Sequence, residues 1–224
     1  MELTNEPTMR VWPSGQKVDV ALVIALDVSA SVTEDEYTLM REGLARALDS
    51  SEVANAVRSG NLGAIALGVM HWSGFQEQRI KIDWTYVTGR TGLRTLADDV
   101  RRSERRYYGG ATDIGGAITF CQKMLLGGPA HASRRIIDLV GDGTNNVNFS
   151  PRINSDQAAA AGITTNALAI PVKDAGLVAY YRQTVIGGQA AFVEQTPDYI
   201  GFATAMKRKL VREITALYSL SMSI

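Results

Sequence analysis

Short apolar runs alternate along the chain with segments whose apolar residues recur at helical spacing. The first run, residues 18–28, is interrupted only by two aspartates. Its length and its β-branched residues are typical of a strand buried on both faces, as in the centre of a parallel sheet. The same pattern predicts further core strands at 62–72, 135–140 and 163–170, an edge strand at 79–84 and a last strand at 189–194.

Between the strands, apolar residues three or four positions apart predict helices that each bury one face. The first helix has a clear start, because Thr33 and Glu36 have the spacing of a capping box. The final helix is predicted to have Pro197 at its first position and to run to Leu217. The other predicted helices cover residues 91–106, 113–126, 155–161 and 174–184.

Strands and helices alternate to the end of the chain, which favours a mostly parallel sheet covered by helices on both faces. We therefore expect an α/β protein with three α/β/α layers, in which a doubly wound, Rossmann-like sheet carries one antiparallel edge strand. The length of 224 residues suits one domain of this kind. We assign residues 1–17 to a polar N-terminal extension and residues 18–224 to a single domain.

Composition narrows the range of functions. Lys plus Arg and Asp plus Glu both number 23, so charge gives no reason to expect nucleic acid or an anionic membrane as a partner. The basic run at residues 101–106 is interpreted as a solvated helix face. The single cysteine, Cys121, excludes an intrachain disulfide and a thiolate metal site.

The sequence contains no apolar run near the roughly 20 residues that span a bilayer, so we expect no membrane span. The polar start of the chain also lacks the apolar centre of a secretory signal. A cytoplasmic location and a signal removed before the present first residue both remain open on these grounds.

Oxygen-bearing side chains gather where predicted strands end. Asp27, Ser29 and Ser31 follow the first strand, Asp142 follows the strand at 135–140, and Thr112 lies in a Gly-rich loop. Alternate side chains at a strand end point the same way, and ligands of open α/β sheets bind at this edge. Carboxylate and hydroxyl oxygens suit Mg²⁺, Mn²⁺ or Ca²⁺ rather than zinc or copper. We therefore predict a divalent-cation site, with Mg²⁺ preferred and one position left for water or a partner's carboxylate.

These segments resemble the metal-ion-dependent adhesion site of von Willebrand factor A domains. The family pattern is Asp-x-Ser-x-Ser, then a threonine in a Gly-rich loop, then an aspartate after a core strand. The matching residues here are Asp27, Ser29, Ser31, Thr112 and Asp142. The resemblance extends over about residues 18–217, and a finer one is to a bacterial branch of the family that has no assigned function and is often exported.

The resemblance implies a Rossmann-like fold, a cation held by those five residues, and binding rather than catalysis. The implied partner is a protein or peptide that offers an exposed Asp or Glu to the cation. The implied location is extracytoplasmic, either periplasmic or secreted.

The resemblance also places the loop after the second core strand on the metal side of the sheet. Residues in that loop and in its neighbours are aromatic or carry amides, which suits contact with a protein. The predicted partner-binding rim consists of His71, Trp72, Phe75, Tyr107, Tyr108, Asn145 and Asn146.

Two other functions stay open. A phosphoryl-transfer enzyme also places an aspartate after its first strand, but phosphatases of the haloacid-dehalogenase type need a second aspartate where Ser29 stands. A P-loop and a Gly-x-Ser-x-Gly elbow are both absent from the sequence, and neither His71 nor His131 has an evident acid partner. Because these catalytic groups are missing, we expect a protein that is not an enzyme. The other alternative is a scaffold domain that needs no metal.

Overall fold

The computed structural model describes residues 15–105, 110–128, 131–147 and 149–215, and its centre is one six-stranded sheet. The strands are β1 (Lys17–Asp27), β2 (Ile65–Trp72), β3 (Gln78–Val87), β4 (His131–Gly141), β5 (Ile163–Ala169) and β6 (Val193–Gln195). They lie in the order β3-β2-β1-β4-β5-β6, and only the pair of β2 and β3 is antiparallel. The predicted doubly wound, mostly parallel sheet with one antiparallel edge strand is confirmed.

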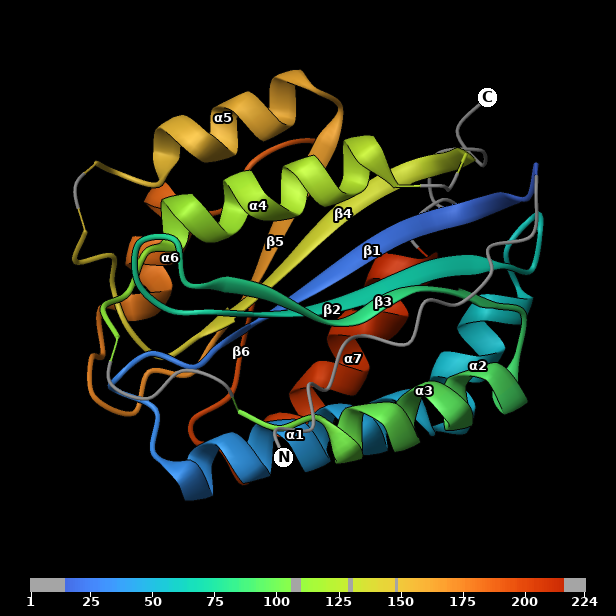
Figure 1. Ribbon diagram of the computed structural model, residues 1–224, viewed down its shortest axis with the longest axis horizontal. Coiled ribbons are helices and arrows are strands. Elements are labelled where there is room, and N and C mark those ends of the chain that lie inside the picture. The colour runs from blue at the N-terminus through green and yellow to red at the C-terminus, as the bar shows by residue number, and fades with distance from the viewer. Residues whose placement is uncertain (1–14, 106–109, 129–130, 148, 216–224) are drawn as a thin grey trace, which may run out of the picture.

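Helices cover both faces of this sheet, as Figure 1 shows. The helices on one face are α1 (Glu34–Leu48), α2 (Ser51–Arg58), α3 (Arg90–Arg102) and α7 (Phe202–Thr215). Those on the other face are α4 (Ile114–Gly127), α5 (Arg152–Ala160) and α6 (Leu177–Thr184). The three predicted layers are therefore confirmed.

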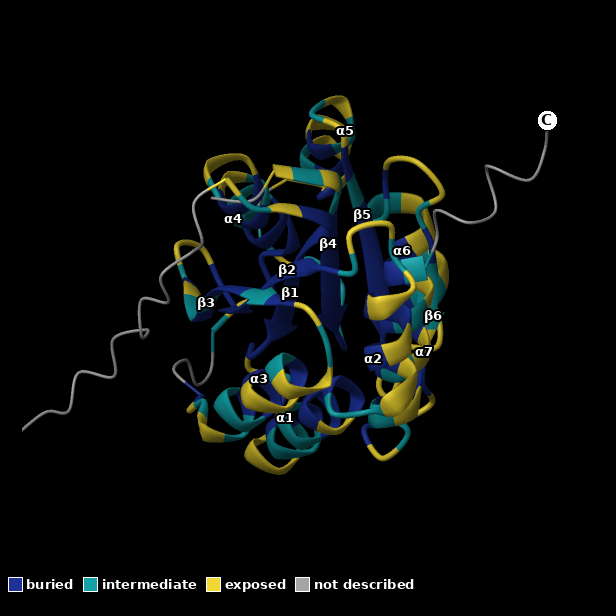
Figure 2. Cartoon of the chain, turned by 90° about the vertical axis from the view of Figure 1, so that its right-hand side faces the viewer, coloured by how far each residue is buried: buried dark blue, intermediate teal, exposed yellow. Residues whose placement is uncertain are grey.

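Two apolar cores, one on each face, explain why the central strands are continuously hydrophobic. In β1, Leu22 and Ile24 belong to the core under α1 and α7, whereas Val23 and Ala25 belong to the opposite core. Because alternate residues face opposite sides of a strand, a strand covered on both sides needs apolar residues at every position. Figure 2 shows this buried sheet between helices whose outer surfaces are exposed.

The start of α1 agrees with the prediction, but the sequence pattern does not predict the helix that follows α1. Glu36 N donates to Thr33 Oγ1 at 3.3 Å, and Thr33 N donates to the Glu36 carboxylate at 2.7 Å, which completes the capping box. The next helix, α2, starts where the Ser50 side chain accepts a hydrogen bond from Val53 N. It has only eight residues, about two turns, so its periodicity is too short to separate from the end of α1.

The predicted start of the last helix is wrong, since α7 begins at Phe202 rather than at Pro197. The intervening residues form hydrogen-bonded turns. Thr196 Oγ1 donates to the carbonyl oxygen of Asp198 at 2.9 Å, and Gly201 N donates to Asp198 Oδ1 at 2.8 Å. Aspartate and threonine side chains stabilise local turns as readily as they cap helices, so the same residues here form a loop.

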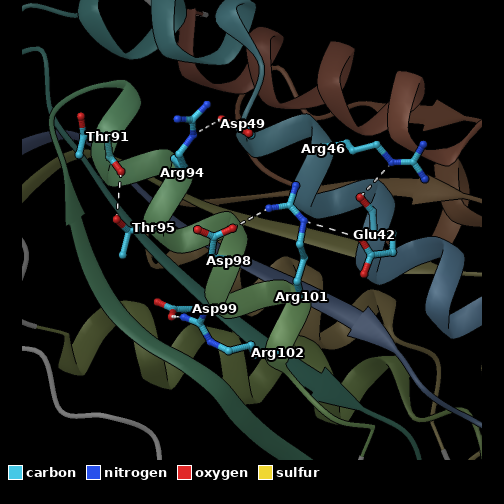
Figure 3. A network of polar contacts seen from close by, with 10 residues as sticks. All are labelled: Glu42, Arg46, Asp49, Thr91, Arg94, Thr95, Asp98, Asp99, Arg101 and Arg102. Carbon is cyan, nitrogen blue, oxygen red and sulfur yellow. Dashed lines mark hydrogen bonds and ion pairs between the residues drawn. The ribbon is translucent and has the colours of Figure 1, made fainter.

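Charged side chains join α1 and α3 at the surface, as Figure 3 shows. Arg101 lies 2.7 Å from Asp98 on its own helix and 3.7 Å from Glu42 on α1, and Arg102 pairs with Asp99. Exposed pairs of this kind add little to stability. The interpretation as a solvated helix face is therefore confirmed for Arg101 and Arg102.

Candidate metal centre

Asp27 and Asp142 lie at the carboxyl ends of two adjacent strands. β1 and β4 are paired up to Leu26 and Val140. Asp27 is the last residue of β1, and Asp142 is the first residue after β4. Here the strand order reverses, because β1 has β2 on one side and β4 on the other. Such a switch point is where open α/β sheets bind ligands. It lies towards the left of Figure 1.

Serine hydroxyls connect the two aspartates. Ser31 Oγ donates to Asp142 Oδ1 at 2.5 Å, and Ser29 Oγ lies 3.1 Å from Ser31 Oγ. Ser29 N donates to Asp27 Oδ1 at 2.7 Å, which orients the Asp27 carboxylate. The structure therefore brings four of the five predicted metal-binding residues into one hydrogen-bonded chain.

Thr112 borders the same space. A Cβ atom on Gly143 would lie 3.9 Å from Thr112 Oγ1 and 4.0 Å from Ser31 Oγ, so both hydroxyls are close to this glycine. Thr112 N donates to the Asn146 side chain at 2.8 Å, and Asn146 N donates to Thr112 O at 3.0 Å. These paired bonds hold the threonine loop beside the loop that carries Asp142.

The two carboxylates are buried with too few partners. Asp27 and Asp142 are 0% and 2% exposed, and within the described part of the chain neither Oδ2 atom has a hydrogen-bond partner. Burial raises the pKa of Asp27 to about 7, and the negative charge of Asp142 adds to this effect. Burying unpaired carboxylates is unfavourable. A cation between them would remove that cost.

The donor atoms fit a hard divalent cation. Within the ranges that the structure describes, no three or more His, Cys, Asp or Glu side chains gather to hold a metal. A cation at this site would therefore depend on two carboxylates and three hydroxyls. Oxygen donors of this kind are the ones that Mg²⁺, Mn²⁺ and Ca²⁺ prefer.

Gly141 and Tyr181 shape the floor of the site. A Cβ atom on Gly141 would lie 2.5 Å from Tyr181 Oη and 3.1 Å from Asp27 Oδ2, so a larger residue would displace both groups. The Tyr181 hydroxyl donates to the carbonyl oxygen of Gly143 at 3.1 Å, which supports the loop around Asp142. Sequence reasoning misses Tyr181, because only the packing of α6 brings it here.

Arg105 supports the loop at residues 27–31. Its Nη2 atom donates to the carbonyl oxygens of Val28 and Ser29, each at 3.1 Å. Arg105 is only 8% exposed, so its assignment to a solvated helix face is wrong. The helix α3 ends at Arg102, and beyond that end the Arg105 side chain reaches inward.

His71 and Trp72 do not form an exposed rim, contrary to the prediction. Both are 0% exposed, because β2 is covered on both faces up to its last residue. The Trp72 indole donates to the carbonyl oxygen of Ala25 at 3.2 Å, and the His71 ring packs edge-on against Tyr37 with centroids 5.4 Å apart. Burial lowers the pKa of His71 to about 3, so this side chain is uncharged at neutral pH.

The other predicted rim residues divide into three groups. Phe75, in the turn between β2 and β3, is 65% exposed and accessible to a partner. Asn145 and Asn146 use their side-chain oxygens within the protein, where they accept hydrogen bonds of 2.9 and 2.8 Å from backbone amides next to the threonine loop. Tyr107 and Tyr108 lie outside the described residues.

Exposed apolar side chains gather around this end of the sheet. The described ranges contain seven exposed large hydrophobic residues. Five of them lie in segments that follow the carboxyl end of a strand, and for one of these the segment is the β2–β3 turn. These five are Phe75, Phe149, Ile153, Val172 and Ile200, and we call them the apolar ring. Ile153 lies in the first turn of α5, and the other four lie in loops, where single apolar residues have no periodicity. Sequence reasoning therefore finds only Phe75.

A shallow hollow is lined in part by Phe149, one of these five residues. Its volume is about 360 Å³, and it is lined by Asn145, Asn146, Val147, Phe149, Ser150 and Tyr180. Asn146, which lines the hollow, accepts the hydrogen bond from Thr112 N, so the hollow lies beside the threonine loop of the candidate metal centre.

Comparisons with known proteins agree with this fold. A family model described as "Protein of unknown function (DUF1194)" matches residues 17–218. No curated protein shows significant sequence similarity to the chain.

Several solved structures share the architecture. Proximal thread matrix protein 1 from the mussel byssus is 18% identical with a TM-score of 0.64, and the match covers 88% of this chain and 48% of that one. A von Willebrand factor type A protein from Catenulispora acidiphila is 14% identical with a TM-score of 0.60, over 88% of this chain and 43% of that one. The von Willebrand factor domain of the type V pili tip protein Mfa5 from Porphyromonas gingivalis is 10% identical with a TM-score of 0.60, over 90% and 96%. The chain thus spans about half the length of the first two proteins, and the fold is that of a von Willebrand factor A domain.

Proposed function

The chain belongs to DUF1194, a family of proteins of unknown function, and we propose that it is a binding module that uses a divalent cation to hold a partner protein. One observation carries the proposal. The buried carboxylates of Asp27 and Asp142 each have an Oδ2 atom without a hydrogen-bond partner among the described residues. A cation here would balance their charge and offset the free energy of burying them.

The proposed ligands are the side-chain oxygens of Asp27, Ser29, Ser31, Thr112 and Asp142, which bind directly or through water. Mg²⁺ is the preferred ion, with Mn²⁺ and Ca²⁺ as alternatives, because every donor is a hard oxygen. One structure of the mussel protein is described as having a zinc-occupied MIDAS motif, so Zn²⁺ also has to be tested. A bound ion would supply positive charge that attracts a carboxylate, and these five residues would hold it at the end of the sheet where the apolar ring lies.

The proposed partner is a protein with an exposed aspartate or glutamate. Its carboxylate would complete the ion's coordination, while apolar groups beside it would contact the ring around the site. Clustered exposed apolar side chains mark protein interaction surfaces. Catalysis has less support, because His71 is buried and uncharged and His131 lies at the opposite end of β4 from Asp142.

We further propose a location outside the cytoplasm. The similar structures include a byssal matrix protein and a pilus tip protein, whose names place them in extracellular assemblies. Within the described ranges, no helix has the length and apolar character needed to cross a membrane. Fractionation of cells that express the native gene, with immunodetection in each fraction, tests this location.

A metal titration tests the function. We expect Mg²⁺ or Mn²⁺ to raise the melting temperature of the chelator-treated protein, because a ligand bound only by the native state stabilises it. Asp142→Asn should abolish the rise. Asp35→Asn is the matched control, since Asp35 is an exposed carboxylate at the start of α1 outside the site.

The partner is sought by affinity capture in Mg²⁺ and in chelator, with Asp142→Asn as bait in parallel. Recovery of the same protein under all three conditions would favour a scaffold domain that needs no metal. An absence of any thermal response to Mg²⁺, Mn²⁺, Ca²⁺ and Zn²⁺ at millimolar concentration would overturn the metal centre. Phosphatase activity that Asp27→Asn abolishes would instead favour an enzyme.

A further inference from the structure

A lysine of the protein itself lies against the candidate metal centre. Lys173, in the loop between β5 and α6, places its Nζ atom 3.7 Å from Asp142 Oδ2. The same ammonium donates a hydrogen bond to the carbonyl oxygen of Ser31. Asp142 Oδ2 is the buried oxygen that lacks a hydrogen bond. The protein's own cation thus faces the oxygen at which a metal ion would be held.

Lys173 differs from the other groups around the site in its freedom to move. Its side chain is 51% exposed, whereas that of Asp142 is 0% exposed. Among the described residues, this is the single ion pair formed by either site aspartate. A lysine has a flexible stem and a strongly hydrated ammonium, so it can leave for solvent without disturbing the core. Tyr181 and Arg105, in contrast, are fixed by burial and hydrogen bonds.

We propose that Lys173 is a built-in competitor of the divalent cation at Asp142. This inference rests on the proposed metal centre. In the cation-free protein the ammonium partly balances the buried Asp142 carboxylate. Two positive groups a few ångströms apart in a partly buried site repel strongly. The ammonium must therefore withdraw when a cation binds, so Lys173 lowers the cation affinity and sets the concentration at which the site fills.

The test compares the neutral variant Lys173→Met and the charged variant Lys173→Arg with the wild type, by calorimetric titration with MgCl₂ at low ionic strength. We expect Lys173→Met to bind Mg²⁺ about three- to tenfold more tightly, because a nearby positive charge has been removed. Lys173→Arg should stay close to the wild type. Lys123→Met is the matched control, since Lys123 is an exposed lysine on α4 with no contact near the site. It should leave the affinity unchanged.

Melting temperatures give a second, independent result. Lys173→Met should melt below the wild type in chelator, where Asp142 loses its counter-charge, and level with it in saturating Mg²⁺. An equal or weaker Mg²⁺ affinity of Lys173→Met than of the wild type would overturn the competition while leaving the metal centre intact. If no divalent cation changes the melting temperature of either the wild type or Lys173→Met, the proposed function itself is overturned.

Discussion

Asp27 is a buried carboxylate whose ionisation is disfavoured by the fold. It is fully buried, and burial together with Asp142 raises its pKa to about 7. Folding therefore favours the protonated form, and the cation-free protein should lose stability as the pH rises from about 4 to 7. The loss is of the order of 4 kcal/mol, since each pKa unit corresponds to about 1.4 kcal/mol.

Asp27→Asn should remove this pH dependence while keeping an oxygen that accepts the hydrogen bond from Ser29 N. In chelator, we expect its free energy of unfolding to fall less between pH 5 and 8 than that of the wild type, and to exceed it at pH 8. Burial also shifts the pKa values of Glu213 and His71, so their contributions to the pH dependence stay in both proteins. Urea denaturation at the two pH values measures this, with Asp35→Asn as the control. A variant that retained the wild-type slope would show that another group causes it.

The same residues show what a sequence can predict about a site. The Asp-x-Ser-x-Ser order, the threonine loop and the glycines around Asp142 are local patterns, and the structure brings all of these residues together. Arg105 and Tyr181 support the site through contacts between elements distant in sequence, which leave no local signal. His71 and Trp72 were misplaced because a strand can remain covered on both faces to its last residue.

At the scale of elements, α7 is attached to the sheet by buried charges. Lys209 Nζ lies 2.6 Å from Asp138 Oδ1 on β4 and 2.5 Å from Glu213 Oε1 on its own helix. The three residues are at most 1% exposed, and Asn166 on β5 donates to Glu213 Oε1 at 2.9 Å. A cation shared between two carboxylates fixes the position of the helix more narrowly than apolar packing alone.

Lys209→Met should destabilise the protein by about 3–5 kcal/mol, because it leaves Asp138 and Glu213 buried without a counter-charge. The control on the same helix is Lys207→Met, which removes an exposed pair with Glu52 and should have little effect. Chemical denaturation of both variants at neutral pH measures the difference. Equal effects of the two substitutions would mean that the buried lysine contributes no more than a surface one.

Element boundaries were predictable where a hydrogen-bonding motif marks them and not elsewhere. The capping box at Thr33 locates the start of α1 correctly. Thr196 and Asp198 resemble a helix start as well, but their side chains bond to the loop itself and α7 begins only at Phe202. Local sequence cannot decide between a cap and a turn, because both use the same polar side chains.

On the scale of the whole molecule, alternating strands and helices were sufficient to predict the layered fold and the end of the sheet that carries the site. They could not predict the surface around it. The five residues of the apolar ring follow four different strands, and only the three-dimensional arrangement places them at one end of the sheet. Among the described residues, the other two exposed large hydrophobic side chains are those of Leu62, before β2, and Leu126, near the end of α4, both far from the site.

This asymmetry predicts which surface a partner contacts. Phe149→Ser and Ile200→Ser, each in the apolar ring, should lower the affinity for the partner captured in Mg²⁺ by about tenfold, because buried apolar anchors dominate protein interfaces. Leu62→Ser and Leu126→Ser remove comparable exposed side chains at the other end and should leave the affinity unchanged. Mg²⁺ affinity should be equal in all four variants, since none of these residues belongs to the metal centre.

Surface plasmon resonance with the captured partner compares the partner affinity of the ring variants and of the opposite-end variants with that of the wild type. A loss of affinity caused by the Leu62 or Leu126 substitution, with the ring variants unaffected, would place the interface at the opposite end of the molecule and separate partner binding from the metal centre.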